Sequence, residues 1–557
     1  MPITIQNTAG GGVTLDSTTT ANETVNLPTG GGNLITTTGA TFTGNIATKG
    51  ISAVTAGTSN FVAGVNAGNS IVSGGDNNTA VGDEAGTAIT TGDRNTLIGK
   101  QSGSAITTGG NNTAVGYNTL SSNTLADRNV AIGEGSLKTL NVTSNADTYN
   151  TGVGFNSGAS ITTGVQNTLI GALAGDAITT GSSNVASGYL ALSANTTAHS
   201  NTAIGTKSLS ANTTGEENTA LGEFALFTNT TASNNTAVGK AALKLNTTGV
   251  QNTAVGSKSM IDNTIGKYNT ATGYQSLYKN ISGDGNTVNG YNALYQNTTG
   301  SSNTTIGKES LRFNTTGANN TATGYQALYS NTTGTENTAI GKGALENSTE
   351  SSNNTAIGFG ALDANTSGTR NTGLGRSAAY SNTTGSYNTC VGMYARPTGS
   401  GNVNCNVFGY NVVGNSNYTT IGESSLDCRN SHGTNTWATV SDERYKKDIT
   451  DSVAGLSFVN ALRPRTWNYK TKGELPTTFT AYEEGSTEVF KNAQTNHGFI
   501  AQEVKAAIDA DSGLKDGFRM WDDREDGSQE VADAALIPVL VKAIQELSAR
   551  IEVLEGE

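Results

Sequence analysis

Proline is almost absent from this chain, and its few copies lie outside the long central part of the sequence. None of the six prolines occurs between Pro28 and Pro397. A disordered linker of that length has no reason to exclude proline, whereas a stack of paired strands does, because proline cannot donate a hydrogen bond to a strand ladder. Charged residues (14%) and aromatic residues (6%) are also scarce. We therefore expect a repetitive β structure with a thin core rather than a large globular domain.

Other features that the sequence lacks exclude several classes of function. The net charge is −12, whereas a nucleic-acid-binding surface needs a basic patch, so no nucleic-acid partner is expected. The N-terminus lacks the basic start and long apolar run of a secretory signal, and no apolar stretch is long enough to cross a bilayer. This predicts synthesis in the cytoplasm without membrane insertion. Cys390, Cys405 and Cys428 lack a metal-ligand spacing, so we predict reduced thiols, no metal and no cofactor.

A short string, Asn-Thr-Ala-(Ile/Val/Leu)-Gly, recurs along the middle of the chain. Its Asn returns every 17 residues from Asn78 to Asn129 and again from Asn150 to Asn388, and Cys405 continues the register. The step from Asn129 to Asn150 is four residues longer, which predicts a loop insertion. The array therefore contains about twenty units.

The positions within a unit differ in character. Counting from the Asn, the fifth position is always Gly, the fourth is usually branched and apolar, and the ninth is often Leu, as in Gly205, Ile204 and Leu209. Such a unit suits one coil of a parallel β-solenoid or β-roll, with two short strands and two tight turns. We expect the branched residue and the Leu to point inward, and Gly and Asn to occupy turn positions with positive φ. At about 4.8 Å per strand spacing, the rod is roughly 90 Å long. Since each coil buries little, extra burial between chains is expected.

The repeat resembles the head repeats of trimeric autotransporter adhesins, although those units are typically shorter. The resemblance implies a left-handed β-roll packed as a trimer. The array also contains Asn-X-Thr triplets such as Asn212-Thr213-Thr214. These would be glycosylation sites in a secreted eukaryotic protein, but without a signal peptide we interpret them as structural.

Composition divides the chain into four segments. We predict a β-rich attachment or stalk region over 1–77, the repeat shaft over 78–422, a linker over 423–440, and a separate domain over 441–557. The three tryptophans lie beyond the array, and the last segment has 22 acidic and 14 basic residues. This predicts a small α+β domain with a C-terminal helix.

Three motifs mark the last segment: SDERYKKDI from Ser441, HGFIAQEV from His497, and LIPVLVKAIQELSARIEVLE at the end. In the third, apolar residues alternate steps of four and three, which predicts the seam of a short coiled coil. The seam residues are Leu540, Ile544, Leu547, Ile551 and Leu554.

These motifs resemble the intramolecular chaperone domain of phage endosialidases, tail fibres and tailspikes. In that family the domain drives trimerisation and then releases itself by cutting the chain. The resemblance implies that Ser441 is the nucleophile, that Lys446 is its base, and that the scissile bond joins Val440 to Ser441. A serine needs a base to become a nucleophile, and a lysine can serve if desolvation or a nearby cation lowers its pKa. Arg444 and Lys447 are adjacent candidates for that cation.

Other interpretations of these residues remain open. Ser441 before acidic residues could be a helix N-cap. His497 could take part in the site or could order the fold through hydrogen bonds, and Arg444 and Glu503 are better explained as structural partners. Ser441 and Lys446 are five residues apart, so their meeting depends on the fold or on a neighbouring subunit.

The sequence thus predicts a homotrimeric bacteriophage tail fibre whose chaperone is released by autocleavage. We expect a virion protein assembled in the host cytoplasm, held by phage tail or baseplate proteins and contacting a glycan or protein receptor on the bacterial surface. The alternatives are a tailspike-type polysaccharide depolymerase, a bacterial surface adhesin and an ice-binding protein. A glycosidase needs paired carboxylates in a cleft, and the array is poor in acids.

Overall fold

The computed structural model describes residues 3–6, 12–15, 51–52, 56–434, 437–439, 441–511, 514, 518 and 520–556. The chain divides into two compact units, Met1–Val440 and Ser441–Glu557. In the predicted attachment region, β1 (Ile3–Gln6) and β2 (Gly12–Leu15) form an antiparallel pair. The short strand β3 (Ile51–Ser52) pairs antiparallel with the first strand of the array, β4 (Phe61–Ala63). Most other residues of that region lie outside the described part of the chain.

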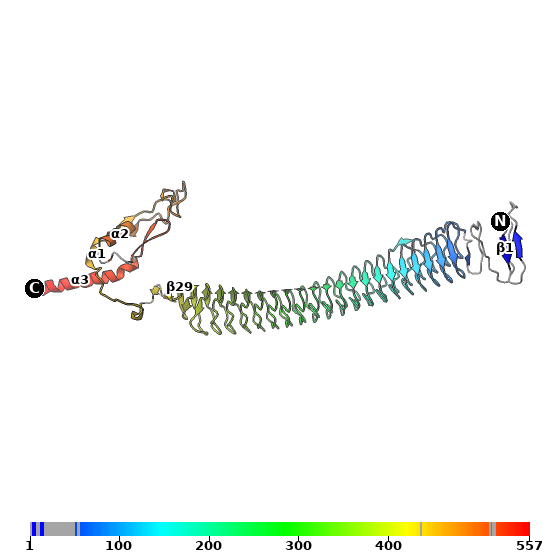
Figure 1. Cartoon of the computed structure of the whole chain (residues 1–557), viewed down its shortest axis with the longest axis horizontal. Coiled ribbons are helices and arrows are strands. Elements are labelled where there is room, and N and C mark those ends of the chain that lie inside the picture. The colour runs from blue at the N-terminus through cyan, green and yellow to red at the C-terminus, as the bar shows by residue number, and fades with distance from the viewer. Residues whose placement is uncertain are drawn as a thin grey trace. The chain divides into compact units, whose positions relative to one another are not determined.

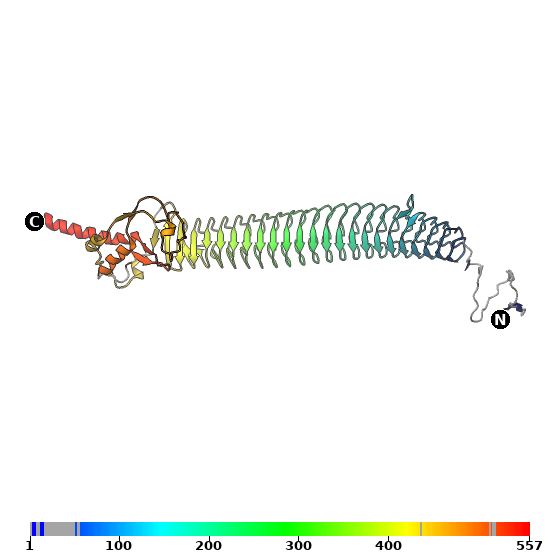
Figure 2. The same ribbon diagram turned by 90° about the horizontal axis from the view of Figure 1, so that it is seen from above.

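The first unit is a parallel β-solenoid of about 21 coils, which confirms the predicted fold class. Figures 1 and 2 show the coils stacked in one row, each contributing a short arrow to the same sheet. In the regular coils, neighbouring strands pair in parallel with a shift of 17 residues, so that Thr202 lies opposite Thr219. After β4 the strands are β5 (Thr79–Val81), β6 (Thr96–Ile98), β7 (Thr113–Val115), β9 (Val130–Ile132), β11 (Thr151–Val153), β12 (Thr168–Ile170), β13 (Val185–Ser187), β14 (Thr202–Ile204), β15 (Thr219–Leu221), β16 (Thr236–Val238), β17 (Thr253–Val255), β18 (Thr270–Thr272), β19 (Thr287–Asn289), β20 (Thr304–Ile306), β21 (Thr321–Thr323), β22 (Thr338–Ile340), β23 (Thr355–Ile357), β24 (Thr372–Leu374), β25 (Thr389–Val391), β27 (Asn406–Tyr410) and β29 (Tyr418–Glu423).

The two ends of the array depart from the strict period. Strand β4 pairs in parallel with β5, so the ladder begins one coil before Asn78. Its string, Asn60 to Gly64, keeps the first and fifth positions of the repeat but lies 18 residues before the next copy. At the other end, β29 turns back into β30 (Leu426–Ser431), which pairs antiparallel with β31 (Trp437–Thr439). Within the array, two further short parallel pairs join β8 (Ala126–Asp127) to β10 (Ala146–Asp147), at the predicted insertion, and β26 (Arg396–Pro397) to β28 (Val413–Gly414).

The prediction of two strands per coil is wrong for the regular coils. Each has one three-residue strand, and the rest of the coil is turn. The reason is a left-handed backbone at the seventh, ninth and seventeenth positions, as at Lys207 (φ 55°), Leu209 (φ 50°) and Glu217 (φ 57°). These residues curl the chain too tightly for a second strand. They still bond to adjacent coils through backbone groups, for example Leu209 N–H to the carbonyl of Ala225 (2.9 Å).

The prediction that the fourth-position residue points inward is also wrong. The Ala at the third position is fully buried, as at Ala203 and Ala339, together with the ninth-position Leu. Side chains alternate along a strand, so the branched residue at the fourth position faces outward. Ile204 is 38% exposed and Ile340 is 39% exposed. The solenoid therefore has an alanine-lined interior and an apolar ridge on its outer sheet face.

The invariant Gly allows the coils to stack closely. Gly239 has a φ of +128°, and a Cβ built there would lie 2.7 Å from the carbonyl carbon and oxygen of Gly256 in the next coil. No larger residue fits at that spacing, which explains the invariance by close backbone approach as well as by conformation.

The recurring Asn residues form buried ladders instead of occupying positive-φ turns. Asn218 Nδ2 donates to Asn201 Oδ1 (3.2 Å) and to the carbonyl of Ala232 (2.8 Å). A second ladder runs through the twelfth position, where Asn229 Nδ2 donates to Asn212 Oδ1 (2.9 Å) and to the same Ala232 carbonyl (2.9 Å). Both side chains are buried, and a buried amide must be hydrogen-bonded to be tolerated. The ladders thus link each coil to its neighbour and clamp its two sides together.

The second unit is a small α+β domain, as predicted. Its elements are η1 (Glu443–Tyr445), α1 (Leu456–Ala461), β32 (Arg465–Trp467), η2 (Lys472–Glu474), β33 (Asn496–Gly498), α2 (Ala501–Ala510), β34 (Trp521–Asp523), β35 (Gln529–Val531), η3 (Asp533–Leu536) and α3 (Ile537–Glu555). Phe458 of α1, Val504 and Ile508 of α2, and Val539 of α3 lie in one apolar core. The strands form two antiparallel pairs, β32 with β33 and β34 with β35.

Helix α3 has two different faces. Pro538 stands in its first turn, where a missing N–H costs nothing. Val539 and Ala543 are buried in the domain, and Glu546 accepts a hydrogen bond from the N–H of Leu456 at the start of α1 (2.9 Å). The predicted seam lies on the other face and is exposed in the single chain, up to 71% at Leu554.

Candidate functional site

The first residues of the second unit bring Ser441 and Lys446 together. Lys446 Nζ donates a hydrogen bond to Ser441 Oγ at 2.8 Å. The contact depends on the turn η1, in which Tyr445 N–H bonds to the Asp442 carbonyl (3.1 Å) and Lys446 N–H bonds to the Glu443 carbonyl (2.9 Å). This single turn brings Ser441 and Lys446 together although they are five residues apart, so the pair forms within one chain. A nucleophile and its base need this distance.

The N-cap of η1 is Asp442, and Ser441 does not occupy that position. The Asp442 carboxylate accepts from the backbone N–H of Arg444 (2.9 Å) and from its guanidinium (2.9 and 2.6 Å). These bonds, together with the nearby charge of Lys446, hold the pKa of Asp442 below its ordinary value. Arg444 is therefore paired with Asp442. This pairing neutralises its charge, so Arg444 is not the free cation near Lys446 that the sequence suggested. The Ser441 hydroxyl is left to the lysine.

Both members of the pair are exposed in the single chain. A lysine must lose its proton before it can act as a base. Removal of water favours the neutral amine, so the pair has suitable geometry but lacks the dry surroundings that would make it reactive. Val440, the other side of the predicted scissile bond, lies outside the described residues.

Glu503 takes part in a separate cluster on α2. Its carboxylate bonds to the guanidinium of Arg465 (2.9 and 2.5 Å) and lies 3.7 Å from Arg463. The hydrogen bonds from Arg465 above all hold the pKa of Glu503 below its ordinary value. The cluster ties α2 to β32, a structural role consistent with the interpretation from sequence.

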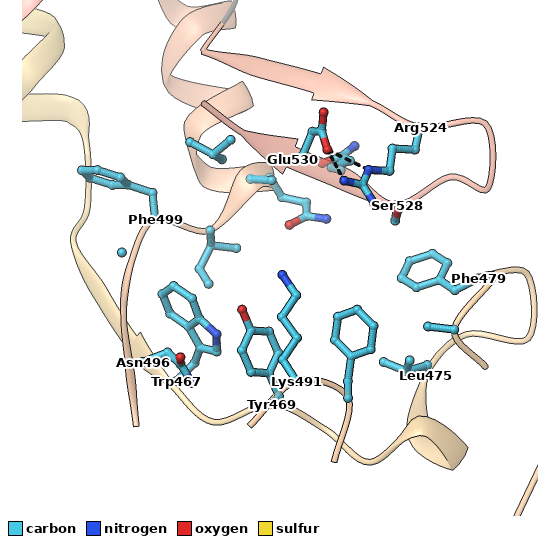
Figure 3. A pocket seen from close by; sticks show the side chains of 18 of the residues that line it. Trp467, Tyr469, Leu475, Phe479, Lys491, Asn496, Phe499, Arg524, Ser528 and Glu530 are labelled. Carbon is cyan, nitrogen blue, oxygen red and sulfur yellow. Dashed lines mark hydrogen bonds and ion pairs between the residues drawn. The ribbon is translucent and has the colours of Figure 1, made fainter. Parts of the chain in front are cut away.

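His497 lies on β33, opposite Thr466 of β32, and lines a cleft of about 910 Å³ in the second unit. Five aromatic side chains lie in the cleft wall, among them Trp467, Tyr469 and Phe479 (Figure 3). Arg524 and Glu530 form an ion pair at another side (Figure 3). Among the described contacts, neither His497 nor Glu503 touches Ser441 or Lys446. Sequence reasoning did not identify this cleft, although its aromatic residues are dense for so aromatic-poor a chain.

The described part of the chain shows no group of three or more His, Cys, Asp or Glu side chains placed to hold a metal ion. Within the same residues, no helix combines the length and the apolar character of a membrane span. Burial raises the pKa of the Cys405 thiol to about 11, which disfavours the thiolate needed for reactivity.

Residues 441–512 match the family model described as "Chaperone of endosialidase" (Peptidase_S74). The match begins at Ser441, the residue at which the second compact unit begins, and it includes the His497 motif. It implies a self-cleaving intramolecular chaperone in this segment. No curated protein matches the chain. The family match and the β-solenoid together support a protein of the phage tail-fibre or tailspike type.

Proposed function

We propose that this chain is a trimeric bacteriophage tail fibre whose C-terminal unit directs assembly and then cuts itself off before Ser441. The observation that carries the proposal is the 2.8 Å hydrogen bond between Lys446 Nζ and Ser441 Oγ at the first residue of the chaperone-like unit. The array serves as the shaft that contacts the host surface. The N-terminal region is held by tail or baseplate proteins, and the fibre is assembled in the host cytoplasm.

The exposed apolar residues of the two units support a trimer. Fourth-position residues such as Ile306 (47% exposed) form a ridge along the outer sheet face, and the α3 seam is exposed as well. A ridge of this kind is unfavourable in water, whereas apolar burial contributes about 25 cal/mol per Å². A seam of about two heptads is marginal by itself, so α3 and the array stabilise the same assembly.

Cleavage follows from the position of the serine. Lys446 takes the proton from Ser441 Oγ, which attacks the carbonyl carbon of Val440 in the peptide bond directly before it. The C–N bond breaks, the Ser441 nitrogen receives the proton, and the Val440 acyl group is held as an ester on Oγ. Water then hydrolyses the ester, leaving a carboxylate on Val440 and a free amine and hydroxyl on Ser441.

Assembly controls this reaction by removing water from the two side chains. Ser441 and Lys446 are exposed in the single chain, and a neighbouring subunit covers them in the assembled trimer. Desolvation then favours the neutral amine, and cutting begins only when the three chains are in register.

The experiment compares the wild type with Ser441→Ala, Lys446→Ala and the control Lys470→Ala, an exposed lysine outside the site, on a denaturing gel with N-terminal sequencing. We expect the wild type and Lys470→Ala to give fragments 1–440 and 441–557, the smaller beginning at Ser441. The other two variants should stay intact while still forming trimers. An uncut wild type would refute autocleavage, and cutting in Ser441→Ala would refute the assigned nucleophile.

The enzymatic alternative, a polysaccharide depolymerase, can be tested on the same material. Incubation of the assembled fibre with bacterial polysaccharide should release no reducing ends if the array acts as a binding shaft. A time-dependent rise in reducing ends would favour the depolymerase.

A further inference from the structure

The sixth position of the repeat, just after the invariant Gly, forms a row along the solenoid whose composition changes from one end to the other. In its first half the row mixes acids, cations, small residues and aromatics. From residue 274 to residue 376 it contains aromatic and cationic side chains alone, and all of them are exposed. We call this stretch the aromatic–cation row: Tyr274, Tyr291, Lys308, Tyr325, Lys342, Phe359 and Arg376.

Contacts between neighbouring coils order these side chains. Lys308 Nζ lies between two rings, 5.8 Å from the centre of Tyr291 and 5.7 Å from that of Tyr325. Lys342 Nζ is likewise 5.7 Å from the rings of Tyr325 and Phe359. Each cation is thus held by aromatic faces, which lowers the entropy cost of fixing it against a ligand.

The charges of the row are not neutralised by the protein. In the first half of the sixth-position row, Lys100 pairs with Asp83 (3.3 Å) and Lys240 pairs with Glu223 (2.9 Å) of the preceding coil. Among the described residues, no carboxylate lies within ion-pair distance of Lys308, Lys342 or Arg376. In a chain with a net charge of −12, an exposed row of unpaired cations is complementary to an anionic partner.

The spacing and the ring contacts restrict the kind of anion. The cations occur on every second coil, about 9.6 Å apart at the usual strand spacing, which is too sparse for the dense phosphates of nucleic acid. Single-stranded nucleic acids also need free ring faces for base stacking. Here those faces are occupied, because Tyr274 stacks on Tyr291 at 5.5 Å and the other rings flank cations. A polymer of hydroxyl-rich units with widely spaced carboxylates fits the row. Its carboxylates match the cations, and its hydroxyl groups match the tyrosine hydroxyls between them.

We infer that the aromatic–cation row binds a linear acidic polysaccharide, with the chain lying along the solenoid axis. Lys308, Lys342 and Arg376 bind its carboxylates, and Tyr291 and Tyr325 bind its hydroxyl groups. This inference rests on the proposed function of the array as the part of a fibre that contacts the host.

The test measures binding of the purified full-length assembly to polygalacturonate, a linear polymer with one carboxylate per sugar. Dextran serves as the uncharged control and an oligothymidylate as the nucleic-acid control. The variant K308Q/K342Q/R376Q is compared with K100Q/K240Q, which changes the same row where its lysines are already paired. Exposed ion pairs each contribute about a two- to threefold gain in affinity, so the triple variant should bind about tenfold more weakly and the control variant within twofold of wild type. The charge-retaining variant K308R/K342R should bind as the wild type does, which separates lost charge from lost fold.

Equal binding by wild type and the triple variant would overturn the inference. So would equal binding to dextran, or tighter binding to the oligothymidylate. Trimer formation and cleavage before Ser441 are scored on the same preparations. If the chain still forms trimers and is still cleaved but does not bind the polymer, the proposed fibre function is retained and the polysaccharide site is refuted. A monomeric, uncut chain would instead defeat the proposed function itself.

Discussion

Removing one Asn side chain from the ladder at the first position of the repeat should weaken the solenoid locally. In Asn269→Ala the lost side chain takes with it four hydrogen bonds. Two run from Nδ2, to Asn252 Oδ1 (3.2 Å) and the Gly283 carbonyl (2.8 Å), and two run to Oδ1, from Asn286 N–H (2.9 Å) and Nδ2 (3.0 Å). The position is fully buried, so water does not readily replace these bonds.

The size of the destabilisation depends on which of the four partner groups still has a hydrogen bond in the variant. Asn252 Oδ1 still accepts from the backbone N–H of residue 269 (3.0 Å), and the Gly283 carbonyl still accepts from Asn280 (2.9 Å). Asn286 N–H loses its acceptor, which costs about 1–3 kcal/mol, and each other bond was worth about 1 kcal/mol net. We expect a loss of about 4–6 kcal/mol in local stability.

Hydrogen–deuterium exchange is the appropriate assay, because a solenoid coil depends mainly on its neighbours. Peptides spanning residues 252–300 should exchange roughly 1,000- to 10,000-fold faster, since 1.4 kcal/mol corresponds to a factor of ten. Peptides near residue 112 should be unchanged. Lys267→Ala, an exposed change two residues earlier, is the matched control. Exchange equal to that control, or a uniform rise along the whole array, would refute the ladder as the source of local stability.

Three further predictions concern stacking, assembly and pH. Gly239→Ala should disrupt the shaft around that coil, because the new Cβ would lie 2.7 Å from the backbone of Gly256; limited proteolysis should then cut there and leave distant coils intact. Leu547→Glu places a charge in the exposed α3 seam and should leave the chain monomeric and uncut by analytical ultracentrifugation and gel; a cut trimer would contradict the proposed role of the seam. Arg465 holds the pKa of Glu503 below its ordinary value, so this pair stabilises the second unit above the unfolded-state value of about 4.3 and its contribution is lost as the pH falls through the lower folded-state value. Glu503→Gln should weaken that pH dependence in thermal melts, and an unchanged acid profile would show that the pair does not contribute.

The period of the repeat was sufficient to predict a parallel β-solenoid, but it could not assign the two faces of its strand. Hydrophobicity favours Ile204 over Ala203 for the interior, yet the narrow coil admits the alanine and turns the isoleucine outward. The left-handed backbone at Leu209 was equally hidden, since leucine rarely adopts it and tertiary packing decides. Likewise, Asn suggested turns because turns favour it, whereas the buried ladders depend on contacts between coils 17 residues apart.

The candidate site was predictable as a list of residues, but its surroundings were not. The motif and its family resemblance identified Ser441 and Lys446, and the turn η1 brings them within hydrogen-bond distance. The pairing of Arg444 with Asp442 removes one proposed source of activation. It was not apparent from spacing, because a run of alternating charges allows several pairings.

The one-dimensional bonding of the solenoid has a consequence for how such a protein changes over generations. Each coil is joined to the rest through the strand before it and the strand after it, as β14 is joined to β13 and β15. Duplication or loss of a 17-codon stretch would therefore lengthen or shorten the shaft by about 4.8 Å and leave both termini in working order. Reach toward a target can be selected in small, equal increments, independently of the machinery that folds the molecule.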